Sequence, residues 1–190
     1  MSLRKVFTEY EHWYRTTYLA TSEDDGDAPG ALDGLATLTK RRLAALEAKE
    51  GPLPAAYHEL VLEVGVGEVL LATSSEPVAF TVLAPPQIPK ARAHLLAGLD
   101  AATRRRAQEK EGLDPAKLMP FLVDRDWNMW ALLGHQNAKD DRALLFSHEQ
   151  ERRPSQALFA PKGTLETYFA ALFAKAKARA SPWHLWTGAR

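Results

Sequence analysis

Residues 121–133 read FLVDRDWNMWALL, and this stretch decides the fold. It contains two apolar runs, 121–124 and 127–133, separated by an Arg-Asp step. Runs of about 4–8 apolar or aromatic residues bounded by turn-forming residues are typical of β-strands. A third such run, 143–147, follows after a polar loop. Neighbouring strands joined directly to one another predict an antiparallel arrangement rather than alternating β-α-β units.

Shorter apolar runs extend the predicted sheet in both directions. Residues 68–72 and 77–83 form a plausible strand pair around Thr-Ser-Ser-Glu, and 157–160 is a further short run. Because the strands come in neighbouring groups, we expect an α+β fold with a mixed, largely antiparallel sheet.

Apolar residues at three- and four-residue steps predict helices around this sheet. The predicted helices cover about residues 3–18, 32–50, 54–64, 90–111 and 164–176. The first has an unusually aromatic face, which we interpret as docked on the core, with a partner-binding face as the alternative. Thr164 is placed to cap the last helix.

Size and charge limit the class of protein. A chain of 190 residues with 46% hydrophobic and 25% charged residues suits one globular domain. The 24 basic and 24 acidic side chains cancel. Nucleic-acid binders usually carry a basic surplus, because phosphate neutralisation supplies most of their affinity. We therefore expect no nucleic-acid partner.

Cysteine content and hydropathy indicate the compartment. The chain has no cysteine, which excludes disulfides, thiolate nucleophiles and cysteine zinc sites. Charged residues run through the first 18 positions, unlike a signal peptide. No apolar stretch approaches the roughly 20 residues that a membrane helix needs. We expect a cytoplasmic protein with no membrane partner.

One cluster of residues could carry acid–base or metal chemistry. His135, Asp140, Asp141, His148 and Glu149 lie on loops that flank a predicted strand. Such side chains bind metals or exchange protons when loops bring them together. Polar loops also collect Asp and His for turn formation and solvation. We interpret the cluster as loop surface, and keep a metal-assisted hydrolase using His135, Asp140, Asp141 and His148 as an alternative.

Other motifs give no support to catalysis. Residues 65–67 (GVG) lack the third glycine of a dinucleotide fingerprint and the Lys of a P-loop. Ser147 and His148 are adjacent on the chain, which is poor geometry for a serine–base hydrogen bond. Residues 104–106 (RRR) fall toward the end of a predicted helix, where arginines favour the C-terminal dipole. We expect no enzyme, no catalytic residue, no metal site and no cofactor.

Four segments form a pattern when they are taken in order. Residues 53–60 read LPAAYHEL, 121–132 read FLVDRDWNMWAL, 143–149 read ALLFSHE, and a Phe-containing helix follows at 164–174. This pattern resembles the SMI1/KNR4 superfamily (SUKH domains), whose bacterial members are mostly immunity proteins against polymorphic toxins. The chain departs from the family at its turns, where Gly-Val-Gly, Arg-Asp and a single Ser replace Asn-Gly-Gly, Gly-Asp and Trp-Asp.

The resemblance implies a fold, a partner and a division of the chain. It implies a mixed sheet with helices packed on one side, no catalytic residues, and a 1:1 complex with a cognate protein toxin. It divides a single domain, 1–190, into an N-terminal helical extension (1–51), a SUKH-like core (53–174) and a C-terminal tail (181–190). A regulatory or scaffolding module of the same fold is the alternative.

Aromatic side chains with nearby charges are the expected contact residues, because a few such anchors carry most interface energy. We predict partner-binding roles for Asp124, Asp126, Trp127, Trp130, Asp140, Asp141 and Glu149. Trp183 and Trp186 in the tail are further candidates. If 127–133 is one strand, Trp127 and Trp130 face opposite sides of the sheet, so at most one belongs to the core.

Overall fold

The computed structural model describes residues 2–21, 28–127, 129–135, 143–147, 158–181 and 185. Within them the chain forms one seven-stranded sheet in which each strand pairs with the next along the sequence. All pairings are antiparallel. The strands are β1 (Leu35–Ala36), β2 (Val66–Leu71), β3 (Val78–Val82), β4 (Leu118–Asp124), β5 (Met129–His135), β6 (Ala143–Ser147) and β7 (Phe159–Pro161). The predicted α+β class with a largely antiparallel sheet is confirmed.

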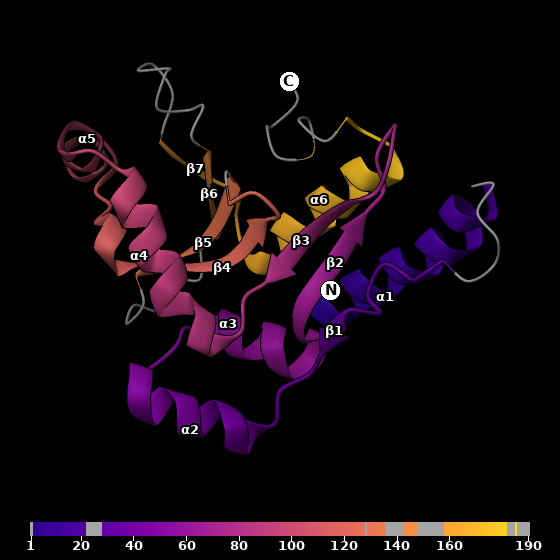
Figure 1. Ribbon diagram of the computed structural model, residues 1–190, viewed down its shortest axis with the longest axis horizontal. Helices are drawn as coiled ribbons and strands as arrows, with labels where there is room; N and C mark the ends of the chain where they lie inside the picture. The colour runs from indigo at the N-terminus through magenta and orange to yellow at the C-terminus, as the bar shows by residue number, and fades with distance from the viewer. Residues whose placement is uncertain are drawn as a thin grey trace.

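Six α-helices surround this sheet in the described residues (Figure 1). They are α1 (Leu3–Trp13), α2 (Lys40–Glu50), α3 (Ala55–Glu59), α4 (Ile88–Gly98), α5 (Ala101–Glu111) and α6 (Leu165–Lys177). π-helical segments continue two of them, Tyr14–Tyr18 after α1 and Leu60–Val64 after α3. As predicted, Thr164 caps α6 by accepting a hydrogen bond from the Thr167 amide.

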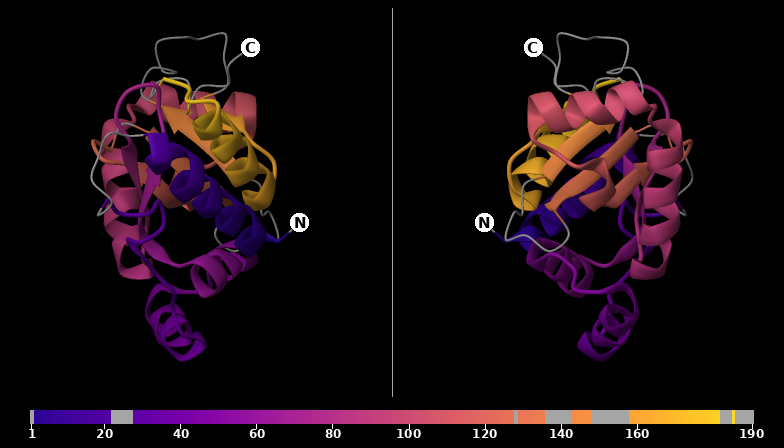
Figure 2. Two further views of the ribbon diagram at one scale, coloured as in Figure 1. Left: turned by 90° about the vertical axis from the view of Figure 1, so that its right-hand side faces the viewer. Right: turned by 90° about the vertical axis from the view of Figure 1, so that its left-hand side faces the viewer.

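The helices α1 and α6 lie side by side and cover one face of the sheet (Figure 2). Phe7 of α1 packs edge-on against Phe173 of α6, with ring centroids 4.9 Å apart. Tyr10 stacks on the same Phe173 ring at 4.2 Å. The aromatic face of the first helix is buried. The segment expected as an extension therefore supplies part of the hydrophobic core.

Helix α4 lies on the other side of the sheet (Figure 1), where its His94 stacks on Trp130 of β5. The expectation that helices pack on one side only is therefore wrong. The reason lies in β4, where consecutive residues from Leu118 to Val123 are all buried. Strands that are apolar on both faces need a covering layer on each.

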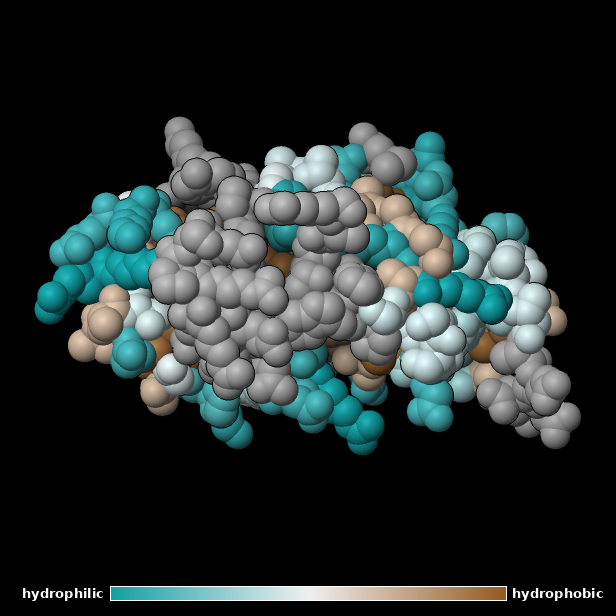
Figure 3. All heavy atoms as spheres, turned by 90° about the horizontal axis from the view of Figure 1, so that it is seen from above, coloured by the Kyte–Doolittle hydropathy of each residue, from teal (hydrophilic) through white to brown (hydrophobic). Residues whose placement is uncertain are grey.

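The predicted single helix 90–111 is two helices, α4 and α5. Asp100 begins α5 by accepting a hydrogen bond of 2.6 Å from the Thr103 amide. This hydrogen bond lowers the pKa of the Asp100 carboxyl. Arg104 then reaches back and donates to the carbonyl oxygens of Leu96 and Leu99, at the end of α4. The arginines thus lie in the first part of α5, and Arg104 stabilises the preceding helix. The outer surface of α5 is hydrophilic (Figure 3, left).

The second predicted helix begins later than expected. Leu35 and Ala36 form β1, which pairs with Gly67 and Val66 of β2. Gly67 has a φ of +127°, and a Cβ atom added to it would lie 2.1 Å from the Gly34 carbonyl oxygen. The Gly-Val-Gly segment therefore allows two backbones to approach closely, a role that glycine alone can fill.

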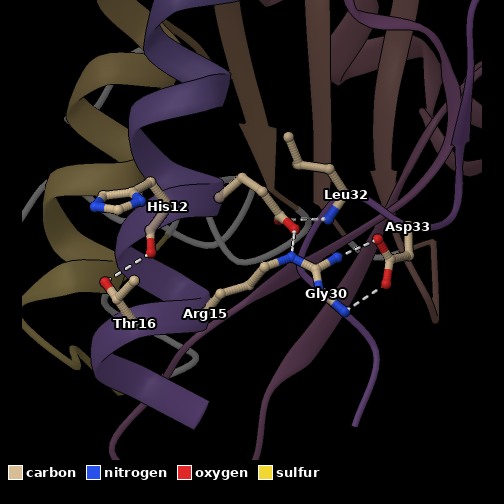
Figure 4. A network of polar contacts seen from close by, with 7 residues as sticks. His12, Arg15, Thr16, Gly30, Leu32 and Asp33 are labelled. Carbon is tan, nitrogen blue, oxygen red and sulfur yellow. Dashed lines mark hydrogen bonds and ion pairs between the residues drawn. The ribbon is translucent and has the colours of Figure 1, made fainter. Parts of the chain in front are cut away.

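Polar contacts attach the segment before β1 to the end of α1 (Figure 4). Arg15 pairs with Glu11 and, at 2.5 Å, with Asp33. Asp33 accepts a hydrogen bond from the Gly30 amide at 2.7 Å, and Glu11 accepts one from the Leu32 amide at 3.0 Å. These contacts fix where the chain enters the sheet.

One carboxylate fastens the edge strand β7 to α5. The two oxygens of Glu111 accept hydrogen bonds from the amides of Leu158 (2.6 Å) and Phe159 (2.9 Å). We expect Glu111→Ala to lower the free energy of unfolding by about 1–3 kcal/mol, because two backbone donors lose their acceptor. Urea denaturation measures this. The exposed Glu109→Ala on the same helix is the control, expected to change stability by less than about 0.5 kcal/mol. Equal effects of the two substitutions would contradict this role for Glu111.

Candidate partner-binding site

The turn between β4 and β5 presents a large aromatic side chain at the protein surface. The Trp127 amide donates a hydrogen bond of 3.2 Å to the Asp124 carbonyl oxygen and closes the turn. Trp127 itself has φ +59°. A bulky L-residue in this left-handed region is strained by about 1–2 kcal/mol. Backbone strain of this kind clusters at functional sites, where surrounding contacts maintain it.

Three aromatic rings meet beside this turn, and we call them the Trp127 cluster. They are His94 of α4, Trp127 of the turn and Trp130 of β5. The two Trp rings meet edge-to-face with centroids 5.4 Å apart. His94 of α4 contacts Trp127 at 5.2 Å and stacks on Trp130 at 5.8 Å. Trp130 is completely buried, Trp127 is half-buried and His94 is exposed. The cluster is therefore anchored in the core by Trp130, while Trp127 and His94 are accessible to solvent.

The structure corrects the prediction for Trp130. Its side chain is 0% exposed, so it cannot be a surface anchor in this conformation. The expectation that the two Trp rings face opposite sides of a strand is also wrong. Trp127 precedes β5 and lies in the turn, where its left-handed backbone directs the ring toward Trp130. Among the described residues, the Trp130 indole N–H has no hydrogen-bond acceptor.

Three of the predicted contact residues share this turn. Asp124 is half-buried, Asp126 is exposed, and the half-buried Trp127 contacts His94 of α4. Arg125 is exposed beside Asp126, so charges of both signs border the cluster. Polar and charged rims around a few aromatic anchors are the usual anatomy of protein interfaces.

The remaining predicted site residues fall outside the described residues. These are Asp140, Asp141, His148 and Glu149, together with Trp183 and Trp186 of the tail. For His135 the structure describes only the backbone, within β5. In the tail, the structure describes Leu185, which is buried.

Sequence reasoning missed His94. The helix that carries it has only a weak apolar face, and no histidine motif surrounds it. Its partners Trp127 and Trp130 lie more than 30 positions further along the chain. No local signal could connect the three, because tertiary packing alone brings α4 to the β4–β5 turn.

Other polar pairs in the described residues are structural. His58 Nε2 lies 2.8 Å from Glu47 Oε1, and the same oxygen accepts a hydrogen bond from the Leu53 amide. The pair joins α3 to α2. The described residues contain no group of three or more His, Cys, Asp or Glu side chains placed to hold a metal ion. The predicted cluster around His135 and His148 is outside this search and stays a prediction.

Comparisons with protein-family models, with curated proteins and with solved structures all returned no match. The resemblance to the SMI1/KNR4 superfamily therefore rests on the quoted motifs alone. In the part of the chain that the structure describes, none of the helices combines the length and apolar character needed to cross a membrane.

Proposed function

We propose that this chain is a protein-binding domain of the immunity type, which neutralises a cognate bacterial toxin by forming a one-to-one complex that blocks it. The observation that carries the proposal is Trp127, half-exposed and held in a strained turn beside the exposed His94. The nature of the partner rests on the resemblance of residues 53–174 to the SMI1/KNR4 superfamily.

The Trp127 cluster has the physical properties of an interface hot spot. Trp is the residue type most enriched among such anchors. Contacts with Trp130 and His94 restrict the Trp127 ring before any partner arrives. A ring that is already ordered loses less conformational entropy on binding, so more of its contact energy appears as affinity.

The surroundings of the cluster suit a specific complex. Arg125 and Asp126 on the turn and Lys90 one turn before His94 on α4 are all exposed. Mixed charges around an aromatic centre favour one orientation of the partner and disfavour others. A stable complex of this type typically buries about 1,600 Å² in total, so the interface extends beyond the cluster to α4 and the adjoining turn.

The proposal is tested by co-expressing the full chain with the toxin-like product of a neighbouring gene. We expect growth rescue and a 1:1 complex. Trp127→Gly removes the ring and relieves the left-handed strain, so the fold persists while the dissociation constant rises by about 30-fold or more. Calorimetric titration measures this change.

Trp13→Ala is the matched control, because Trp13 is also half-buried but belongs to α1, on the other side of the sheet. We expect it to change the affinity less than about threefold. Absence of any complex and of rescue would overturn the proposal. A Trp127-dependent complex without rescue would overturn the immunity role and assign the surface to a regulatory or scaffolding partner.

A further inference from the structure

A cavity of about 170 Å³ lies between α1, the chain around β1 and the π-helical segment Leu60–Val64. Apolar side chains from all three contribute most of the lining, and two of the three also contribute a charged side chain. The lining includes Arg4, Phe7, Leu32, Leu35, Glu63 and Val64. The cavity is on the α1 side of the sheet, whereas the Trp127 cluster is on the α4 side.

The apolar walls of this cavity are firmly held. Phe7 is 2% exposed and packs against Phe169 of α6, with ring centroids 4.7 Å apart. The Leu32 amide donates a hydrogen bond of 3.0 Å to the Glu11 carboxylate (Figure 4). The Leu35 amide in turn donates to the Leu32 carbonyl oxygen at 3.0 Å. The cavity therefore has its shape before a ligand arrives, which lowers the entropic cost of binding.

The third wall is a π-helical turn. The Gly65 amide donates to the carbonyl oxygen of Leu60, five residues earlier, at 3.0 Å. Glu63 and Val64 belong to this wide turn and line the cavity. π-helical turns are rare and frequently occur at functional sites. The turn is thus an independent indication that this part of the surface has a role besides packing.

Arg4 and Glu63 bring opposite charges to the same cavity. Both side chains are exposed. In the part of the chain that the structure describes, neither side chain makes a hydrogen bond or an ion pair, either with the other or elsewhere. Arg4 also lies in the first turn of α1, where a positive charge opposes the helix dipole. Its charge therefore does not stabilise α1 and is available to an anionic group.

We propose that this cavity binds a free apolar α-amino acid, a role separate from the proposed toxin complex. The Arg4 guanidinium takes the carboxylate, with which it can form two parallel hydrogen bonds. The Glu63 carboxylate takes the ammonium group, and Phe7, Leu35 and Val64 contact the apolar side chain. A cavity of about 150 Å³ accommodates benzene, so a volume of about 170 Å³ suits a side chain such as that of leucine or phenylalanine. A simple anion or cation would leave one of the two protein charges unpaired.

The test uses the full chain with L-leucine and, separately, with L-phenylalanine. Equilibrium dialysis measures the affinity, and the melting temperature is recorded at each ligand concentration. We expect a dissociation constant in the millimolar range or lower, with a melting temperature that rises as either amino acid is added.

Three analogues of leucine separate the parts of the site. Isopentylamine lacks the carboxylate, isocaproate lacks the ammonium group, and glycine keeps both charges but has no apolar side chain. Each should bind about fivefold or more weakly than leucine, since each gives up one of the proposed contacts.

Variants assign the two charges. Arg4→Gln and Glu63→Gln should each weaken leucine binding about fivefold or more. Arg4→Gln should also abolish the advantage of leucine over isopentylamine, and Glu63→Gln its advantage over isocaproate. Lys5→Gln and Glu59→Gln are the matched controls, because both residues are exposed neighbours of the same charge outside the lining. Their affinity for leucine should be unchanged, and all four variants should melt within a few degrees of the unmodified chain.

The proposal is overturned if neither amino acid binds at about 10 mM, a concentration well above the expected dissociation constant. It is also overturned if the analogues bind as tightly as leucine, or if the control variants weaken binding as much as Arg4→Gln and Glu63→Gln. None of these measurements involves a protein partner, so their outcome is independent of the toxin experiment.

Discussion

Replacing Trp130 by alanine should lower the free energy of unfolding by about 3–5 kcal/mol, the usual loss for a large aromatic side chain in a core. The ring is completely buried in β5. Its strand neighbours across the sheet are Val123 and Phe146, and His94 closes the space above it. Removal leaves a cavity that these packed elements cannot easily fill. Equilibrium urea denaturation measures the loss.

Two further substitutions show whether the loss comes from packing. Trp130→Phe keeps an aromatic ring and removes an N–H that has no acceptor among the described residues, so we expect a smaller loss, below about 2 kcal/mol. Trp127→Ala removes a half-buried ring and should also cost less than Trp130→Ala. A loss below about 1 kcal/mol for Trp130→Ala would contradict the burial of this side chain.

The second large effect is expected at the junction of α1 with α6. Phe173→Ala should lower the free energy of unfolding by about 3–5 kcal/mol. The Phe173 ring is 2% exposed. It stacks on Tyr10 at 4.2 Å with an angle of 6° between the rings, and meets Phe7 edge-on at 4.9 Å. Urea denaturation again measures the loss.

A double-mutant cycle tests whether α1 belongs to the core. Phe7→Ala and Phe173→Ala should be non-additive, with a coupling energy of about 0.5–1.5 kcal/mol for the edge-on ring pair. Lys5→Ala on the exposed side of α1 is the control partner, and its coupling to Phe173→Ala should be near zero. Additive effects for the Phe pair would show that α1 does not pack against α6 as described.

Most strands could be predicted from the sequence because their signals are local. The runs 68–72, 77–83, 121–124 and 143–147 coincide closely with β2, β3, the end of β4 and β6. Each run is apolar or β-branched and is bounded by turn-forming residues, and both properties depend on near neighbours only. The turn at Asp124 and Asp126 was predicted for the same reason, whereas Trp127 was expected in the strand and lies in the turn.

The elements that were missed depend on contacts that helical spacing does not reveal. The break between α4 and α5 follows Gly98, the last residue of α4, and it is stabilised by Asp100 and by Arg104 reaching back to Leu96. β1 has two residues and exists because Gly67 lets a second backbone approach. Helical spacing alone could not distinguish these residues from a continuing helix. A capping side chain decides where α5 begins, and for β1 the competing contact comes from a strand about 30 residues further along the chain.

The sequence by itself determined the class of fold, the positions of most strands along the chain and the Arg-Asp turn that precedes Trp127. Only the tertiary structure decided which Trp is core and which is accessible, and that His94 joins them. It also decided that Arg4, Phe7 and Glu63 line one cavity. The physical reason is that the spacing of apolar residues predicts which face of a helix or strand is buried, whereas a binding site depends on which helices and strands contact one another. Long-range packing of both faces of the sheet settles that second question.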